Sequence, residues 1–145
     1  MTTPTSTMTY TVSASTRAGG AASVHAGTSD IAFDGSAQSG EALPGPADLL
    51  CAALSACILK NVERFSHMLP FRYESASIEV TAEREEPPPR IVRLHYRLRV
   101  VTDEPAARVE LLHKNIRKFG TITNTLAAAC ELAGEIEAVS SGGAT

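Results

Sequence analysis

The longest amphipathic segment of the chain follows Pro46. Proline suits the first position of a helix, where its missing N–H has no partner to lose, and Pro70 later disfavours helical geometry just before it. Between these two prolines, apolar side chains recur at helical spacing, at Leu50, Ala53, Leu54, Cys57, Ile58, Val62 and Phe65. The pattern predicts a helix from Pro46 to about Ser66 or His67, with Cys57 at the centre of its apolar stripe.

Two later segments, residues 75–83 and 94–100, alternate with the period of a β-strand. Their inward positions are Ala76, Ile78, Val80 and Ala82 in the first segment, and Leu94, Tyr96, Leu98 and Val100 in the second. A proline-rich turn separates them, which predicts an antiparallel hairpin. This hairpin brings the acidic strand against the basic one, placing Glu83 near Arg93 and Glu79 near Arg97.

Cross-strand pairs of opposite charge contribute about 0.2–1 kcal/mol each and help to fix the register. We therefore interpret the basic face of the hairpin as a solvated surface that its neighbouring strand largely neutralises. A nucleic-acid site on this face is the weaker interpretation. The charge of the whole chain agrees, because its formal net value of −3 lacks the basic excess typical of nucleic-acid binding.

The segments before the long helix carry weaker signals. Short strands are predicted at residues 9–16, 21–26 and 30–33, and together they form a small meander. Residues 34–45 are rich in Gly, Ser, Ala and Pro, which predicts a loop leading into the helix.

The hairpin is followed by a second predicted helix. Asp103 is its expected cap, Pro105 lies in its first turn, and Gly120 marks its end. Its inner stripe consists of Val109, Leu112, His113 and Ile116.

A third helix and a last strand are predicted beyond Gly120. Thr123 is the expected cap of a helix through residues 126–132, which Gly134 ends, and residues 136–139 add an edge strand. Residues 1–8 and 140–145 are predicted to be disordered.

The length of 145 residues and the hydrophobic content of 43% suit a single domain over residues 1–145. The polar N-terminus has no secretory signal, and no apolar run is long enough to span a bilayer. We therefore expect a cytoplasmic protein that binds neither membrane nor nucleic acid. In a reducing compartment Cys51, Cys57 and Cys130 are expected to be thiols.

The chain contains no GxSxG elbow, P-loop or GxGxxG motif, and its histidines and cysteines lack the spacing of a metal site. The sequence therefore predicts no metal and no cofactor, and thiol chemistry is left. Cys57 is the main candidate, because Cys51 lies on another helix face and Cys130 falls in an Ala-rich predicted helix of the core.

Two interpretations of Cys57 remain open on pattern alone. Free cysteines often pack as small hydrophobes, and the centre of an apolar stripe suits that role. A reactive thiol needs thiolate character, but Cys57 lies about three turns beyond Pro46, out of reach of the helix dipole. A cation would have to supply the effect, and Arg17, in the predicted turn after the first strand, is the candidate.

Four segments of the chain resemble the OsmC/Ohr family, the osmotically induced and organic hydroperoxide resistance proteins. Residues 45–57 read GPADLLCAALSAC and resemble the start of the family's central helix. Residues 77–84 (SIEVTAER) resemble its next strand, residues 118–126 (KFGTITNTL) its second motif, and residues 135–137 its last strand. The resemblance extends in order over residues 9–139.

This resemblance implies an α+β fold with an N-terminal β-meander, a long central helix, a β-hairpin, two further helices and a final strand. It also implies an intertwined homodimer, with the central helices buried between two sheets and the active thiols at the subunit interface. Cys57 matches the family's peroxidatic cysteine, and Arg17 is the candidate for its activating arginine.

Two positions depart from the family's pattern. The second cysteine, which resolves the oxidised thiol, is replaced here by Gly120. The glutamate after the helix-opening proline is replaced by Ala47, with Asp48 as the nearest carboxylate.

The resemblance leaves two functional hypotheses. The first is a one-cysteine thiol peroxidase, which reduces organic hydroperoxides or hydrogen peroxide through Cys57 and is regenerated by an external thiol. The alternative is a non-catalytic dimer that binds a small apolar ligand at the subunit interface, with Cys57 in the lining.

Overall fold

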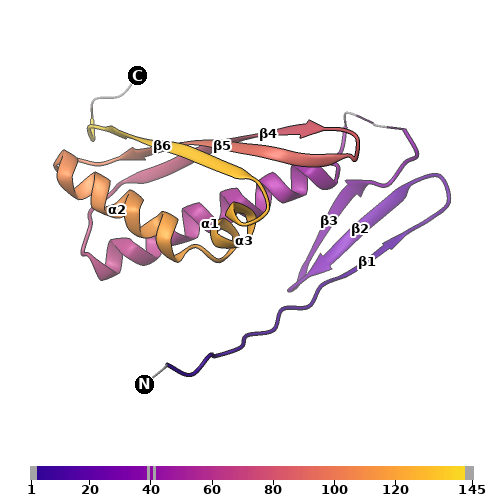
Figure 1. Ribbon diagram of the computed structural model, residues 1–145, viewed down its shortest axis with the longest axis horizontal. Helices are drawn as coiled ribbons and strands as arrows, with labels where there is room; N and C mark the ends of the chain where they lie inside the picture. Colours follow the sequence, from indigo (N-terminus) through magenta and orange to yellow (C-terminus); the bar gives the residue numbers. More distant parts are fainter. Residues whose placement is uncertain (1–2, 39, 41, 143–145) are drawn as a thin grey trace. The chain divides into compact units, whose positions relative to one another are not determined.

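The computed structural model describes residues 3–38, 40 and 42–142. It divides into two compact units, Met1–Leu49 and Leu50–Thr145. In chain order the elements are β1 (Ser13–Thr16), β2 (Ala21–Ala26), β3 (Ser29–Asp34), α1 (Pro46–Met68), β4 (Ser75–Glu85), β5 (Arg90–Val101), α2 (Ala106–Phe119), α3 (Thr121–Ala127) and β6 (Glu131–Val139) (Figure 1). The order confirms the predicted α+β class and its sequence of elements.

The first unit is built around an antiparallel sheet in the order β1-β2-β3. The predicted meander is confirmed, but the prediction that its first strand begins at Thr9 is wrong. Ser13 pairs with His25, and β2 ends one residue later, so it offers residues 9–12 almost nothing to pair with. Tyr10 and Val12 are consequently exposed.

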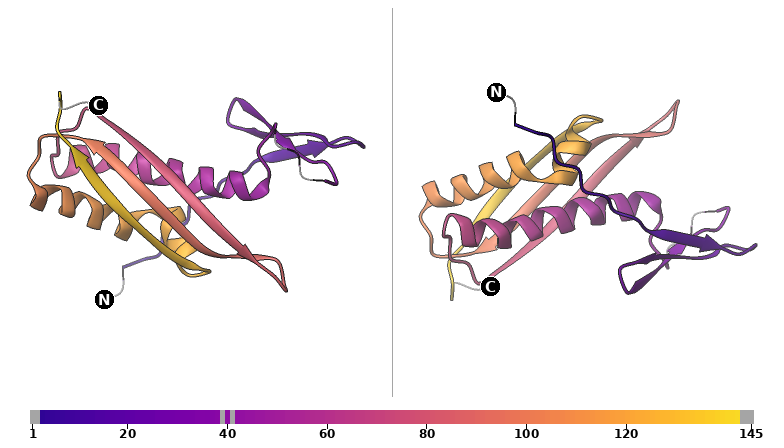
Figure 2. Two further views of the ribbon diagram at one scale, coloured as in Figure 1. Left: turned by 90° about the horizontal axis from the view of Figure 1, so that it is seen from above. Right: turned by 90° about the horizontal axis from the view of Figure 1, so that it is seen from below.

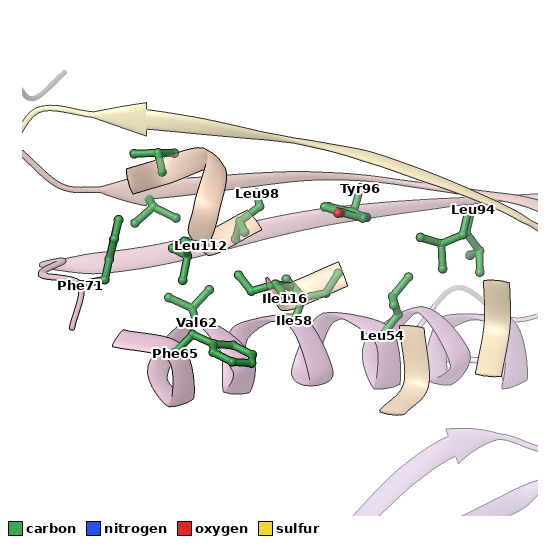
Figure 3. Close-up of a cluster of buried hydrophobic side chains, with 13 residues drawn as sticks. Leu54, Ile58, Val62, Phe65, Phe71, Leu94, Tyr96, Leu98, Leu112 and Ile116 are labelled. Atoms are coloured by element: carbon green, nitrogen blue, oxygen red, sulfur yellow. The ribbon is translucent and has the colours of Figure 1, made fainter. Parts of the chain in front are cut away.

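The second unit places its helices on one face of a sheet in the order β4-β5-β6 (Figures 1 and 2). β4 and β5 pair antiparallel, whereas β5 and β6 pair in parallel. α1 and α2 lie side by side in both views of Figure 2, and both lie below this sheet in Figure 1. Alternate side chains of β5 point toward α1 and α2 (Figure 3), and the core consists of Leu54, Ile58, Val62, Phe65, Phe71, Leu94, Tyr96, Leu98, Val100, Val109, Leu112, Ile116 and Leu132.

The predicted hairpin register is confirmed. Glu83 pairs with Arg93 and Glu79 with Arg97 across β4 and β5. Arg93 forms an ion pair with Glu83 and a second with Glu131 of β6, at 2.9 Å. The basic strand is thus neutralised from both sides, which supports its interpretation as a solvated face.

The predicted cap of α2 is wrong. Pro105 occupies the N-cap position, and no side chain caps the helix there. Asp103 instead accepts a hydrogen bond from the backbone N–H of Ser141 at 3.0 Å. Ser141 also donates through its hydroxyl to Glu74 at 2.7 Å, so both carboxylates hold the chain after β6.

The predicted boundaries of the third helix and the last strand are also wrong. α3 begins at Thr121, with Gly120 at its N-cap position, and ends at Ala127. Gly134 lies inside β6 opposite Tyr96 and does not end a helix. A Cβ atom at Gly134 would come within 2.2 Å of the Tyr96 ring, so this glycine is needed for a close approach between neighbouring strands.

The ends of the chain are only partly described. The disorder predicted for residues 1–8 and 140–145 falls outside the described residues at 1–2 and 143–145. Residues 3–8 form no helix or strand.

Within the described part of the chain, no helix combines the length and hydrophobicity that crossing a bilayer requires.

Candidate functional site

Cys57 lies at the edge of the buried face of α1. The predicted helix is confirmed, and its N-terminus is closed by Asp48, whose carboxylate accepts a hydrogen bond from the Gly45 N–H at 2.9 Å. Leu54 and Ile58 are fully buried against the sheet, whereas Cys57 is only half-buried. The thiol is therefore neither sealed in the core nor on the open surface of the chain.

Two neutral polar side chains approach the sulfur of Cys57. The Nδ2 atom of Asn61, one helical turn later, donates to the Cys57 carbonyl at 2.9 Å and lies 3.7 Å from Sγ. The hydroxyl of Thr123, from α3, lies 4.0 Å from the same sulfur. Asn61 and Thr123 are 7% and 4% exposed, so packing holds both side chains in place.

Gly120 makes room for the Thr123 hydroxyl. A Cβ atom at position 120 would lie 2.7 Å from Thr123 Oγ1 and 3.1 Å from the Ile116 carbonyl oxygen. The φ angle of Gly120 is −76°, which any residue adopts, so the constraint here is space and not backbone conformation. The junction of α2 and α3 thus faces Cys57 with a hydroxyl group.

Comparison with known proteins identifies the family. A model of the OsmC-like protein family matches residues 38–133, well over half of the chain. The chain belongs to the OsmC-like family. No curated protein shows a significant match to the sequence.

Solved structures share the OsmC-like fold at low sequence identity. An OsmC-like protein from Mycoplasma pneumoniae has a TM-score of 0.83 at 15% identity, over 91% of this chain and 98% of that one. An organic hydroperoxide resistance protein OsmC from Legionella pneumophila has a TM-score of 0.71 at 13% identity, over 90% and 99%. The organic hydroperoxide resistance protein OhrB of Bacillus subtilis has a TM-score of 0.67 at 16% identity, over 88% and 98%.

Arg17 lies in the turn between β1 and β2, as predicted. Its backbone N–H donates to the Ala21 carbonyl at 2.9 Å, and its own carbonyl accepts from Gly20 at 2.9 Å. Arg17 belongs to the first unit, whereas Cys57 belongs to the second. A role for this guanidinium at the thiol of an OsmC-like protein therefore stays a prediction.

Asp48 has a structural partner at the start of α1. It precedes Cys57 by nine residues, which corresponds to about 13.5 Å along an α-helix and about half a turn around it. Its carboxylate therefore points away from the thiol of its own chain while it caps the helix. Ala47 beside it is exposed, and a role for Asp48 in the reaction stays a prediction.

Cys130 lies between α3 and β6, so its predicted position inside a helix is wrong. The helix ends three residues earlier, and the thiol donates to the Leu126 carbonyl at 3.4 Å. Cys51 and Cys130 are both partly buried against the core. Among the described residues, no three His, Cys, Asp or Glu side chains lie close enough to hold a metal ion.

Two residues beside the thiol were missed in the sequence. Asn61 follows Cys57 by four positions, a spacing that places two side chains next to each other on a helix. A polar side chain at this position of an apolar stripe is therefore a signal from which Asn61 could have been found. Thr123 was interpreted as a helix cap, because Thr commonly precedes helices. Its buried position depends on where α3 begins, which the sequence pattern placed too late.

A second buried polar contact joins β5 to α2. The Tyr96 hydroxyl lies 2.5 Å from His113 Nε2, and the two rings meet edge to face. Burial raises the pKa of Tyr96, whereas the nearby Arg117 acts to lower it. Burial lowers the pKa of His113, and the positive charge of Arg117 lowers it further. Both groups are therefore neutral near pH 7, with Tyr96 as the donor and His113 as the acceptor.

Proposed function

We propose that this OsmC-like protein is a thiol peroxidase, which reduces organic hydroperoxides or hydrogen peroxide through Cys57. The observation that carries the proposal is the half-buried Cys57 sulfur, approached by the Asn61 amide and the Thr123 hydroxyl, both neutral and almost completely buried. The names of the Legionella and Bacillus structures, both organic hydroperoxide resistance proteins, support the substrate class. The reducing cytoplasm is the compartment that would supply the external thiol.

The proposed reaction has an oxidative step and a reductive step. The Cys57 thiolate attacks one oxygen of the peroxide, so an S–O bond forms as the O–O bond breaks. The leaving oxygen takes up a proton and departs as an alcohol, or as water from hydrogen peroxide, and the sulfur becomes a sulfenic acid. One external thiol then condenses with it and releases water, and a second thiol displaces Cys57 and leaves as the external disulfide.

A homodimer completes the proposal. None of the described residues of the first unit is buried, and a three-stranded sheet with no buried side chain needs another surface for its stability. Large apolar side chains are exposed there, among them Met8 at 75% and Tyr10 at 77%. We propose that a second copy of the chain covers them and that Arg17 from one of the two chains supplies the cation at Cys57.

The proposed function is tested by following peroxide consumption and Cys57 oxidation together. Consumption of cumene hydroperoxide is followed with dithiothreitol as the reductant. In separate samples without dithiothreitol, the protein is exposed briefly to the peroxide, and intact mass is recorded with and without a sulfenate trap. We expect the Cys57→Ser variant to lose peroxide consumption and the trapped adduct. Cys130→Ser is the matched control and should retain both.

Unchanged peroxide consumption in Cys57→Ser, with no adduct on wild-type Cys57, would exclude the peroxidase. The interfacial binder of a small apolar ligand would then be the function to pursue.

A further inference from the structure

The polar groups around Cys57 suit an oxidised sulfur better than a reduced one. Asn61 Nδ2 and Thr123 Oγ1 lie 3.7 Å and 4.0 Å from Sγ, at the outer limit for hydrogen bonds to sulfur. A thiol sulfur is a weak acceptor, whereas a negatively charged oxygen forms short, strong hydrogen bonds. An oxygen atom bound to this sulfur and directed toward the two side chains would come nearer to both of them than the sulfur itself does.

Both donors are fixed in advance. The Asn61 amide is oriented by its second hydrogen bond, to the Cys57 carbonyl at 2.9 Å. Thr123 is almost completely buried, and Gly120 leaves the space that its hydroxyl occupies. Donors that are held in place before a reaction stabilise developing charge without having to reorganise.

We propose that Asn61 and Thr123 form a neutral donor pair, which stabilises negative charge on the Cys57 sulfur and on the oxygen transferred to it. The proposal rests on the proposed role of Cys57 as the reacting sulfur. It assigns a function to the position facing Gly120, where the chain carries a hydroxyl group and no second thiol. The sulfenate is then held by hydrogen bonds until an external thiol reduces it.

The donor pair acts on the oxidative step as charge moves from sulfur to oxygen. In the thiolate the two donors meet a charged sulfur at long distance. As the S–O bond forms, part of the charge passes to the transferred oxygen, which accepts stronger hydrogen bonds. The pair therefore stabilises the transition state more than the thiolate, and only this difference accelerates the reaction.

Thr123→Val removes the hydroxyl while keeping the shape of the side chain. Two rates are measured on the full chain: alkylation of Cys57 by iodoacetamide, followed by peptide mass, and oxidation of Cys57 by cumene hydroperoxide. We expect alkylation to slow about threefold, because a lower thiolate fraction is partly offset by higher nucleophilicity. Oxidation should slow about tenfold, because the hydrogen bond to the transferred oxygen is lost as well.

Three further variants make the test specific. Thr123→Ser restores a hydroxyl and should recover both rates, which a purely structural role of the methyl group would not. Thr125→Val changes an exposed threonine of the same helix, whose hydroxyl bonds to Thr121, and should change neither rate. Asn61→Leu should slow oxidation more than alkylation, as Thr123→Val does.

Equal rates in wild type and Thr123→Val, or a failure of Thr123→Ser to recover them, would overturn the donor pair. If peroxide does not oxidise wild-type Cys57 at all but alkylation follows the expected order, the donor pair is supported for the thiolate and the peroxidase is excluded. The two proposals can therefore fail separately.

Discussion

Gly120 and Thr123 share one small space beside the Cys57 sulfur, so any side chain at position 120 would compete with the Thr123 hydroxyl for it. A side chain at position 120 must displace the Thr123 hydroxyl, because its Cβ would lie 2.7 Å from Thr123 Oγ1. A thiol at position 120, where the family resemblance implies a second cysteine, is therefore incompatible with the present position of the Thr123 hydroxyl. This coupling is testable by introducing a thiol at position 120.

Gly120→Cys alone is expected to destabilise the protein by about 1–3 kcal/mol, the usual cost of overpacking. Combined with Thr123→Ala, which removes the obstructing hydroxyl, it should recover part of that loss. After treatment with peroxide, the double variant should form a disulfide between Cys57 and the introduced thiol, detected by intact mass under non-reducing conditions. Gly120→Ala with Thr123→Ala is the control that lacks the thiol.

A double variant whose Cys57 sulfenate is trapped but never converted to a disulfide would contradict this coupling. It would show that position 120 does not face the sulfur closely enough for capture.

His113 predicts how the stability of the fold changes with pH. Burial lowers its pKa from the ordinary value of 6.5, so the unfolded chain binds a proton at a higher pH than the folded chain does. The contribution of His113 to the free energy of unfolding is therefore complete above pH 6.5 and is lost as the pH falls below it. Urea unfolding at about pH 7.5 and pH 5.5 measures this loss.

His113→Gln is the matched variant, because glutamine accepts a hydrogen bond from Tyr96 and does not titrate. It should be less sensitive to acidification than wild type over the same range. An equal loss of stability in both proteins would assign the pH dependence to groups other than His113.

At the level of single residues, Cys57 could be found from the sequence and its donors could not. The apolar stripe placed Cys57 on α1, and the family resemblance marked its thiol. Asn61 lies on the same helix, so its four-residue spacing from Cys57 can be seen in the sequence. The orientation of its amide toward Sγ depends on packing, which the sequence does not show. Thr123 reaches Cys57 from 66 positions away, and no local pattern specifies so distant a contact.

At the level of elements, local signals predicted the type and order of the elements, but they misplaced the cap of α2 and the bounds of β1 and α3, and they did not reveal the parallel pairing of β6. The hairpin of β4 and β5 was predicted with its register, because alternation and opposite charges in neighbouring segments both specify it. β6 pairs in parallel with β5 after two intervening helices, so no turn connects the two strands. Gly134 was therefore interpreted as the end of a helix, although its real constraint is the Tyr96 ring beside it.

Gly134→Ala tests that interpretation of β6. The added methyl group would lie 2.2 Å from the Tyr96 ring, so we expect the free energy of unfolding to fall by about 2 kcal/mol or more. This loss outweighs the small stabilisation that alanine brings by lowering the entropy of the unfolded chain. Denaturant unfolding measures the difference. In a Tyr96→Leu background the ring is gone, and the same glycine substitution should cost less. An equal cost in the two backgrounds would show that the ring does not impose the glycine.

At the level of the whole molecule, one chain leaves apolar surface uncovered in both of its units. Ala53 was predicted on the apolar stripe of α1, yet it is exposed in the single chain, together with Ala52 and Ala56. In the first unit Met8, Tyr10 and Val12 are exposed as well. The proposed intertwined dimer would cover these exposed apolar positions together, since it would bring a partner to the central helix and to the N-terminal sheet.

Ala53→Glu therefore distinguishes a dimer from a monomer. Ala53 is already exposed in one chain, so a monomer would tolerate the carboxylate with little change in stability. In a dimer that covers α1, the change buries a charge at the interface, and we expect dissociation or a dissociation constant raised at least about a hundredfold. Sedimentation velocity over a range of protein concentrations measures this dissociation constant.

Ala133→Glu, on the solvated face of β6, is the control and should leave the assembly unchanged. If both variants sediment as wild type does, α1 is not part of a dimer interface, and the placement of the thiol between two subunits falls with it.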